Sequence, residues 1–363
     1  MDRARELAER GRYTAAPNPL VGVVIARDGR IIGEGFHARA GESHAEAEAL
    51  ENCPDARGAT LYATLEPCNH HGRTPPCTQA ILEAGVSRVV IGHLDPDPRM
   101  QGKSVELLRE AGVEVEVCGE PDLLALLERQ NEQFFRYMQS GRPFVHVKLA
   151  MTLDGRIASG GGQPGWITGE SARRRVHLLR AEAGAVLVGA GTARADDPSL
   201  DVRDVPEGLR APSVTRVVLD PGLSLGPSSR LASTANEQPV VVFAGENAFD
   251  GREAPLREAG VETVPAPVGE YGLDLGFALG ELARRGVRGV LVEGGGETVA
   301  RFARAGLVDK MTLFYAPRFI GSGGVPAIGE LKGAEMSGFE VENVERYGRD
   351  VALTLYPAGG GEG

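Results

Sequence analysis

The residues best suited to chemistry are a histidine, a glutamate and two cysteines near the start of the chain. His44 and Glu46 are two positions apart, and Cys68 and Cys77 follow them with eight residues between the cysteines. A catalytic zinc ion takes three protein ligands in a tetrahedral arrangement and leaves its fourth position to water. One histidine and two thiolates meet that requirement, so we predict that His44, Cys68 and Cys77 bind Zn²⁺.

Glu46 has a different predicted role. A carboxylate two residues after a histidine ligand, on the first turn of a helix, can lie beside the water without binding the metal. Zinc makes water nucleophilic at neutral pH, and a carboxylate can carry a proton from it to a leaving amine. The pattern H-x-E followed by P-C is the signature of zinc deaminases. It predicts hydrolytic deamination of a ring carbon, with Glu46 as the catalytic acid and base.

The spacing of the cysteines leaves an alternative open. The usual signature has two residues between the cysteines, whereas residues 69–76 separate them here. A purely structural zinc would need a fourth protein ligand, which His70, His71 or Cys53 could supply. Taken alone, each residue is better explained as a surface histidine or a buried thiol. The combination with Glu46 favours the catalytic site.

A second chemical signal lies in the last third of the chain. Residues 289–298 read GVLVEGGGET, an apolar run followed by three glycines and a predicted helix. Glycines allow the backbone to approach a phosphate, and a helix N-terminus offers unpaired N–H groups and a positive dipole end. The run predicts a dinucleotide site, although three glycines after a strand are also common in plain turns.

Alternating strand and helix patterns must position these residues, and they predict layered α/β domains. In the first half the predicted strands are 21–26, 31–32, 59–64, 87–92 and 113–117, and the predicted helices are 3–11, 42–50, 78–84, 105–109 and 122–139. After a break at residues 140–143, further strands are predicted at 144–150, 185–189, 215–219, 239–243 and 288–293.

The length of 363 residues exceeds what one hydrophobic core usually supports. We therefore expect one domain at 1–142 with the predicted zinc deaminase site, a second at 143–357 with the predicted dinucleotide site, and a flexible tail at 358–363. The 50 acidic and 39 basic residues give a net charge of −11, which argues against a nucleic-acid partner.

The four cysteines all lie in the first third of the chain, which favours metal-binding or core thiols over disulfides. Without an apolar leader or membrane-length run, a cytoplasmic protein with no membrane partner is expected.

Three segments of the first half resemble the deaminase domain of the bifunctional riboflavin biosynthesis proteins: TAAPNPLVGVVI, GEGFHARAGESHAEAEAL and ATLEPCNHHGRTPPC. The resemblance implies a cytidine-deaminase-like fold and deamination of 2,5-diamino-6-(5-phosphoribosylamino)pyrimidin-4(3H)-one. It also implies that Asn18 and His37 contact the base or ribose and that Arg73 contacts the 5'-phosphate. Asn18 could instead be a turn residue between two prolines, and Arg73 an exposed loop residue.

The second half resembles the reductase domain of the same family through VKLAMTLDGRIA, GWITG, LLRA, VGAGTARADDPSL and EGGGET. The resemblance implies a dihydrofolate-reductase-like fold that uses NADPH to reduce the ribosyl group of 5-amino-6-(5-phosphoribosylamino)uracil to a ribityl chain. The implied cofactor contacts are Ala150, Trp166, Thr192, Asp196, Gly295, Gly296, Glu297 and Thr298. The implied substrate contacts are Arg180, Arg203 and Glu293.

Some roles stay open at this point. Lys148 lies in a strand of alternating apolar residues and either occupies a polar face or assists the substrate. Trp166 is either a core residue or a wall of the nicotinamide site. Arg180 and Arg203 could be solvated charges. The competing functions are a nucleic-acid or nucleoside deaminase fused to a different pteridine-type reductase, and a non-catalytic zinc protein. The predicted ligand is a small phosphorylated pyrimidine, and the sequence is compatible with a homo-oligomer.

Overall fold

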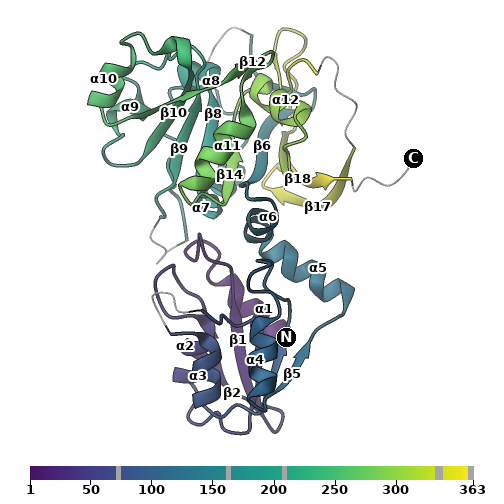
Figure 1. Cartoon of the computed structure of the whole chain (residues 1–363). Coiled ribbons are helices and arrows are strands. Elements are labelled where there is room, and N and C mark those ends of the chain that lie inside the picture. Colours follow the sequence, from purple (N-terminus) through teal and green to yellow (C-terminus); the bar gives the residue numbers. More distant parts are fainter. Residues whose placement is uncertain (71–74, 161–164, 207–210, 332–337, 359–363) are drawn as a thin grey trace. The chain divides into compact units, whose positions relative to one another are not determined.

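The computed structural model separates into two compact units, Met1–Gly141 and Arg142–Gly363, and we describe each by itself (Figure 1). The structure describes residues 1–70, 75–160, 165–206, 211–331 and 338–358. The predicted tail, apart from residue 358, lies outside the described residues, as does Arg73. No helix among the described residues is long and apolar enough to cross a membrane.

The first unit contains a five-stranded sheet in the order β2-β1-β3-β4-β5. β1 pairs antiparallel with both of its neighbours, and the last three strands are mutually parallel. The strands are β1 (Gly22–Arg27), β2 (Arg30–Phe36), β3 (Thr60–Ala63), β4 (Arg88–Ile91) and β5 (Glu114–Val117).

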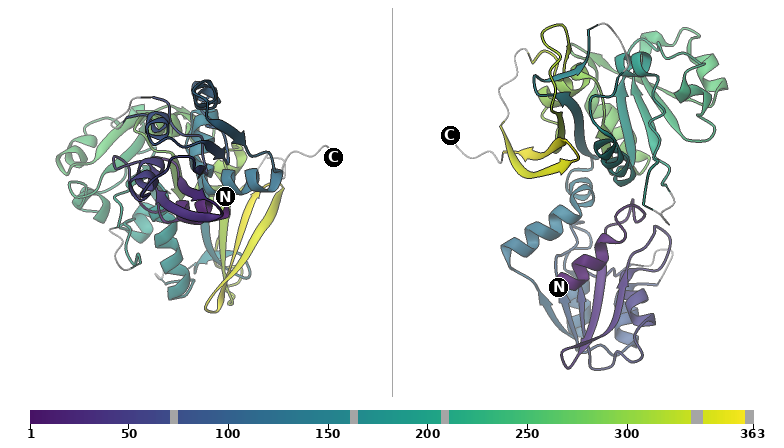
Figure 2. Two further views of the ribbon diagram at one scale, coloured as in Figure 1. Left: turned by 90° about the horizontal axis from the view of Figure 1, so that it is seen from below. Right: turned by 180° about the vertical axis from the view of Figure 1, so that it is seen from behind.

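Successive side chains of a strand point to opposite faces of the sheet. Because both sets contain apolar residues here, helices cover both faces. Val24 packs with α1, whereas Val23 and Ile25 face the core formed with α2, α3 and α4. The helix α1 therefore lies on one face of the sheet, and α2, α3 and α4 lie on the other (Figures 1 and 2). A Cβ on Gly35 would lie 2.4 Å from the Ala45 carbonyl oxygen, so glycine allows α2 to lie close against β2. These helices are α1 (Asp2–Glu9), α2 (Ala45–Glu51), α3 (Cys77–Glu83) and α4 (Lys103–Glu110).

The single helix predicted at 122–139 is wrong. The chain forms α5 (Pro121–Gln130) and α6 (Glu132–Ser140), with a break at Asn131, whose backbone leaves the helical region at φ −116°. The Asn131 side chain is buried and binds the Leu20 backbone, accepting from its N–H at 2.7 Å and donating to its carbonyl at 3.0 Å. This tertiary contact interrupts a segment whose local sequence favours a continuous helix.

The second unit contains a nine-stranded sheet in the order β11-β10-β9-β8-β14-β6-β15-β18-β17. The first seven of these are parallel, and the final hairpin, which the sequence did not predict, is antiparallel. The strands are β6 (Phe144–Thr152), β8 (Ala185–Gly189), β9 (Thr215–Leu219), β10 (Val240–Gly245), β11 (Glu262–Ala266), β14 (Gly289–Val292), β15 (Lys310–Ala316), β17 (Phe339–Tyr347) and β18 (Asp350–Pro357). Two small sheets pair β7 (Arg156–Ala158) with β16 (Val325–Pro326) and β12 (Val268–Gly269) with β13 (Gly272–Leu273).

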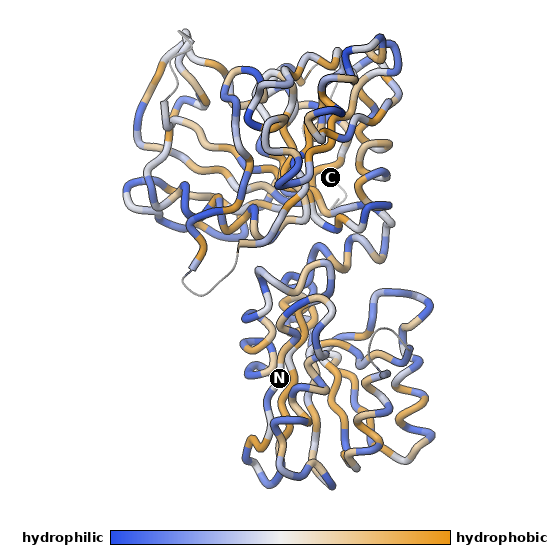
Figure 3. The backbone as a smooth tube through the Cα atoms, turned by 90° about the vertical axis from the view of Figure 1, so that its left-hand side faces the viewer, coloured by the Kyte–Doolittle hydropathy of each residue, from blue (hydrophilic) through white to orange (hydrophobic). Residues whose placement is uncertain are grey.

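Helices also cover both faces of the larger sheet, and its strands β8 and β14 carry no polar side chain (Figure 3). The helices α11 (Leu275–Arg284) and α12 (Gly296–Arg304) pack on one face, and α7 (Glu170–Glu182), α8 (Ala190–Asp196), α9 (Arg230–Ser233) and α10 (Glu253–Glu258) pack on the other. In parallel sheets of this kind, ligands bind beyond the carboxyl ends of the strands. Thr192 and the glycine run both follow such strand ends.

Candidate active sites

The three predicted zinc ligands meet at one point of the first unit. His44 is the residue before α2, Cys68 follows β3, and Cys77 is the first residue of α3. The His44 Nδ1 atom lies 3.2 Å from the Cys77 sulfur and 3.5 Å from the Cys68 sulfur, and the two sulfurs are 3.3 Å apart. The sequence therefore brings together one imidazole and two thiol groups from three separate segments.

This geometry fits a zinc ion. Tetrahedral zinc with Cys and His ligands separates a sulfur from a neighbouring sulfur or nitrogen by about 3.6–3.8 Å, and the three distances here are a few tenths of an ångström shorter. The Cys77 thiol, together with His44, lowers the pKa of Cys68 to about 4 against the effect of burial. The hydrogen bond with Cys68 and burial raise the pKa of Cys77. A negative charge on Cys68 therefore disfavours a second one on Cys77, and a metal cation that binds both sulfurs would remove the remaining proton.

Three described residues, His44, Cys68 and Cys77, form the group of candidate metal ligands, which we call the metal group. It includes neither His70 nor Cys53, and His71 lies outside the residues that the structure describes. His70 is exposed, and Cys53 lies against Gly33 of β2. Within the described chain, a three-ligand set is the arrangement of a catalytic zinc rather than of a closed structural site.

Glu46 is the second residue of α2 and is only 4% exposed. Burial, and then the negative charge of Cys68, raises the pKa of its carboxyl group to about 7. Its carboxylate is not a member of the metal group. A buried carboxyl group beside the ligands, but outside their set, is placed to carry a proton.

Asn18 and His37 lie beside the same group. The His37 ring packs edge-on to the His44 ring with centroids 5.5 Å apart. Its Nδ1 is 3.0 Å from the carbonyl oxygen of Ser43, which can only accept, so Nδ1 carries the proton. The Nε2 atom then accepts from the Asn18 side-chain amide at 3.0 Å. Burial lowers the pKa of His37, in agreement with a neutral ring.

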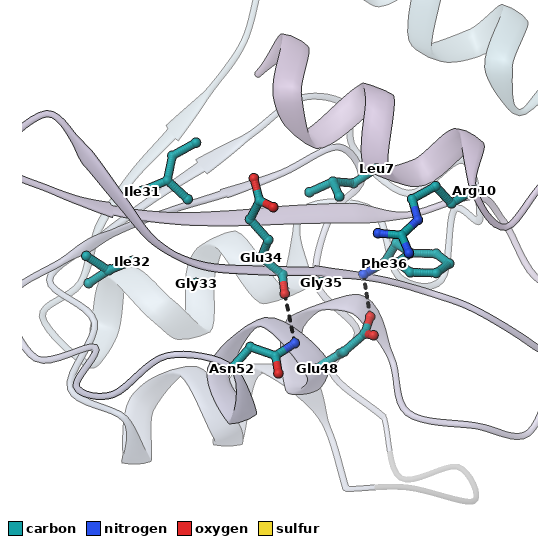
Figure 4. Close-up of a pocket in the computed structure, with 10 residues that line it drawn as sticks. All are labelled: Leu7, Arg10, Ile31, Ile32, Gly33, Glu34, Gly35, Phe36, Glu48 and Asn52. Carbon is teal, nitrogen blue, oxygen red and sulfur yellow. Dashed lines mark hydrogen bonds between the residues drawn. The ribbon is translucent and has the colours of Figure 1, made fainter.

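A pocket of about 520 Å³ beside β2 contains none of the predicted site residues. The Glu48 carboxylate accepts from the Phe36 backbone N–H at 2.6 Å, and the Asn52 amide donates to the Glu34 carbonyl at 3.1 Å (Figure 4). Both backbone groups belong to a strand at the edge of the sheet. The α2 side chains therefore give partners to backbone groups that would otherwise pair with another strand.

In the second unit, the glycine run joins β14 to α12. Gly295 is the residue before the helix, and its N–H donates to the Thr192 hydroxyl at 2.9 Å, which ties the ends of β14 and β8 together. A Cβ on Gly296 would lie 2.8 Å from the Pro326 carbonyl oxygen, so this position requires glycine. Glu297 and Thr298 lie in the first turn of α12. The glycines lead into a helix N-terminus as the sequence predicts, and the use of this N-terminus as a phosphate site stays a prediction.

Three charged side chains meet beside this run. Arg180 of α7 forms a two-point ion pair with Glu293, which follows β14, and the Lys148 ammonium of β6 lies 3.9 Å from the same carboxylate. Although burial opposes it, Arg180 lowers the pKa of Glu293. Burial lowers the pKa of Lys148. Lys148 therefore lies beside charged side chains, and whether it also assists the substrate stays a prediction.

Sequence reasoning missed two neighbours of this cluster. The Asp201 carbonyl accepts from Arg180 at 2.9 Å, and Arg203 lies against His177, with its backbone nitrogen 3.3 Å from Nδ1. The side chain of Arg203 is 56% exposed. His177 precedes Arg180 by three residues on one helix face, a spacing that could have identified it.

The remaining predicted cofactor contacts, Ala150, Asp196 and Trp166, form fewer contacts with the charged cluster around Glu293. Ala150 is on β6 and half-buried, and Asp196 is the exposed last residue of α8. Trp166 is 71% exposed, so the core alternative for it is wrong, and the Arg173 guanidinium lies 4.9 Å from the indole ring. Among the described residues, no hydrogen bond or ion pair joins Trp166 or Asp196 to Glu293. Their roles stay predictions.

Comparison with known proteins decides the family. Residues 143–353 match the RibD C-terminal domain, and residues 1–93 match the cytidine and deoxycytidylate deaminase zinc-binding region. The riboflavin biosynthesis protein RibD of Aquifex aeolicus is 39% identical, over 97% of this chain and 96% of that protein, and RibD of Escherichia coli is 38% identical, over 99% and 98%.

The chain belongs to the RibD family of riboflavin biosynthesis proteins. Solved structures agree: Acinetobacter baumannii RibD has a TM-score of 0.88 at 36% identity, covering 99% of this chain and 98% of that one. The Thermotoga maritima diaminohydroxyphosphoribosylaminopyrimidine deaminase/5-amino-6-(5-phosphoribosylamino)uracil reductase has a TM-score of 0.85 at 37% identity, covering 99% and 97%.

This RibD-family chain is thus an enzyme of riboflavin biosynthesis with deaminase and reductase activities. The predicted α/β fold is confirmed, with a cytidine-deaminase-like domain followed by a dihydrofolate-reductase-like RibD C-terminal domain. Its substrate is a small pyrimidine, and its deaminase region is a zinc-binding one that contains His44, Cys68 and Cys77.

Proposed function

We propose that the first unit deaminates 2,5-diamino-6-(5-phosphoribosylamino)pyrimidin-4(3H)-one and that the second unit reduces the ribosyl group of the product to ribityl with NADPH. This proposal is supported by the presence of two different sites, one in each unit, in a chain of the RibD family. One unit holds a three-ligand metal group with a buried acid, and the other holds a glycine-rich helix start beside a charged cluster.

In the deaminase site, His44, Cys68 and Cys77 would hold zinc, which when bound supplies a water molecule that is nucleophilic at neutral pH. Glu46 takes a proton as the water attacks the ring carbon and delivers a proton to the departing amino group, so ammonia leaves. The Asn18 amide nitrogen is bound to His37. Its carbonyl oxygen is thereby left as an acceptor for an N–H of the base.

In the reductase site, the Gly295, Gly296, Glu297 and Thr298 segment would hold the pyrophosphate of NADPH, which when bound supplies the hydride. Among the described residues, the Lys148 ammonium has no hydrogen bond and is 3.9 Å from Glu293, so its donors are available to substrate hydroxyls. Arg203 is exposed at the edge of the cluster and carries a planar fork suited to a phosphate.

The test is mass-spectrometric product analysis with the diaminopyrimidinone phosphate. Without NADPH, we expect the exchange of one amino group for oxygen and the release of ammonia. With NADPH, we expect the product to gain two further hydrogens. Deamination of a nucleoside or nucleic acid in preference to this substrate, or reduction of a pteridine instead of the uracil product, would contradict the proposal.

A further inference from the structure

Arg216 of β9 carries a buried charge in the second unit. It is 1% exposed, and burial lowers the pKa of its guanidinium. Its Nη1 donates to the Ser199 carbonyl at 3.2 Å and to the Thr234 hydroxyl at 2.7 Å, and its Nη2 donates to the carbonyls of Thr234 at 3.0 Å and Gln238 at 2.5 Å. Among the described residues, no carboxylate forms an ion pair with it. Burying a charge among neutral acceptors is unfavourable. An arginine at this position must therefore provide something that offsets this unfavourable burial.

Ser199, whose carbonyl accepts from Arg216, is the first residue of the segment 199–203, which has a strained backbone. Three non-glycine residues in and beside it have a positive φ: Asp197 at 39°, Leu200 at 53° and Asp204 at 55°. A positive φ is disfavoured for residues other than glycine, and the conformation persists only where neighbours hold it. Arg216 reaches this segment from a central strand of the sheet, which is a rigid base.

The same segment supplies one side of the charged cluster. The Ser199 hydroxyl donates to the Asp201 carboxylate at 2.6 Å, and the Asp201 carbonyl accepts from Arg180 at 2.9 Å. Two residues later, Arg203 lies against His177. The contacts therefore run without a gap from Arg216 through residues 199–203 to both arginines that face the reductase substrate.

We propose that Arg216 is a positioning residue for the reductase substrate. It holds the segment 199–203 so that Arg203 and Arg180 present their guanidinium groups together. The inference rests on the proposed role of these two arginines. Lysine cannot replace Arg216, because one ammonium on a flexible chain cannot reach the acceptors that a planar fork spans.

This arrangement predicts an effect on one substrate only. The glycine run is held through Gly295 and Thr192, and no described hydrogen bond joins either residue to residues 199–203. NADPH binding should therefore not depend on Arg216. A residue that merely stabilised the fold would lower the amount of active enzyme and leave both KM values unchanged.

The experiment compares R216K with R252K in the full-length, zinc-loaded enzyme. Arg252 is an exposed arginine of the same unit, paired with Asp250 on the surface. In R216K we expect the KM for 5-amino-6-(5-phosphoribosylamino)uracil to rise about tenfold or more, as for the loss of a charged hydrogen bond. The KM for NADPH and the rate of ammonia release should stay at wild-type values. R252K should change none of the three.

The inference is overturned if folded R216K keeps the wild-type KM for the uracil substrate, or if both KM values rise together. R203A separates this from the proposed function. A raised substrate KM in R203A but not in R216K rejects the positioning role alone, whereas no change in either variant rejects the proposed phosphate site as well. A raised KM in R216K with none in R203A supports positioning through Arg180 and contradicts only the role of Arg203.

If R216K does not fold, T234V takes its place. This variant removes the hydroxyl that accepts from Arg216 at 2.7 Å and keeps the arginine and the Thr234 backbone carbonyl site. We expect a smaller rise in the KM for the uracil substrate and an unchanged KM for NADPH. An unchanged KM for both substrates in folded T234V overturns the inference.

Discussion

The Arg180 guanidinium and the Glu293 carboxylate face one another in a two-point ion pair, with Nε 2.5 Å from Oε1 and Nη2 3.0 Å from Oε2. A third donor of Arg180 goes to the Asp201 carbonyl. An arginine has five N–H donors, so two remain for a substrate. Arg180 is therefore a fixed part of the charged cluster with two donors left for its proposed substrate contact, and the more exposed Arg203 is freer to meet an anion.

The ion pair makes part of the stability of the reductase unit depend on pH. Arg180 lowers the pKa of Glu293 below its ordinary value of 4.5, so near pH 4 the native state binds fewer protons than the unfolded chain. The contribution is fully present above pH 4.5 and is lost as the pH falls through the lowered pKa. Because E293Q leaves a buried arginine without its counter-charge, it should lower the free energy of unfolding at pH 7 by about 3 kcal/mol.

Urea unfolding at pH 7, 5 and 4 measures this effect. The difference between wild type and E293Q should narrow as the pH falls, because the wild-type carboxylate then becomes protonated. E258Q, which changes an exposed glutamate of the same unit, should differ little from wild type at every pH. A wild-type advantage over E293Q that is the same at pH 7 and pH 4 would show that the ion pair is not its source.

The two sites differ in how far the sequence predicts them. The metal group is read from local spacing, because His44 and Glu46 share a helix start and Cys68 and Cys77 flank one loop. The pairing of Arg180 with Glu293 joins residues 113 positions apart, and nothing in either segment encodes it. Asn131 likewise breaks a helix through a contact with Leu20 that only the folded chain reveals.

G295D should remove NADPH binding without unfolding the reductase unit. Gly295 has ordinary extended backbone angles, φ −66° and ψ 171°, at the position before α12, where aspartate is a favoured cap. The new carboxylate would then occupy the helix N-terminus that the pyrophosphate needs. Fluorescence titration with NADPH and thermal unfolding measure the two effects. G295A is the control and should keep most of the affinity, because among the described residues its Cβ would contact the Thr192 hydroxyl alone, at 3.2 Å.

Metal analysis tests the ligand set of the deaminase unit. The purified protein should contain about one zinc ion per chain, and C77S should lose both the zinc and the release of ammonia. C118S should keep both, because Cys118 is not a member of the metal group. Full zinc content together with full deaminase activity in C77S would exclude Cys77 as a ligand.

The division of labour between the two units is the central claim, and E46Q tests it most directly. Zinc content, ammonia release and NADPH oxidation are measured on this one variant, with the diaminopyrimidinone phosphate and with the already deaminated uracil compound. We predict wild-type zinc, a loss of ammonia release of about 10²–10⁴-fold, and undiminished NADPH oxidation on the deaminated compound. Folded E46Q that still releases ammonia at the wild-type rate, or that no longer oxidises NADPH, would contradict the account.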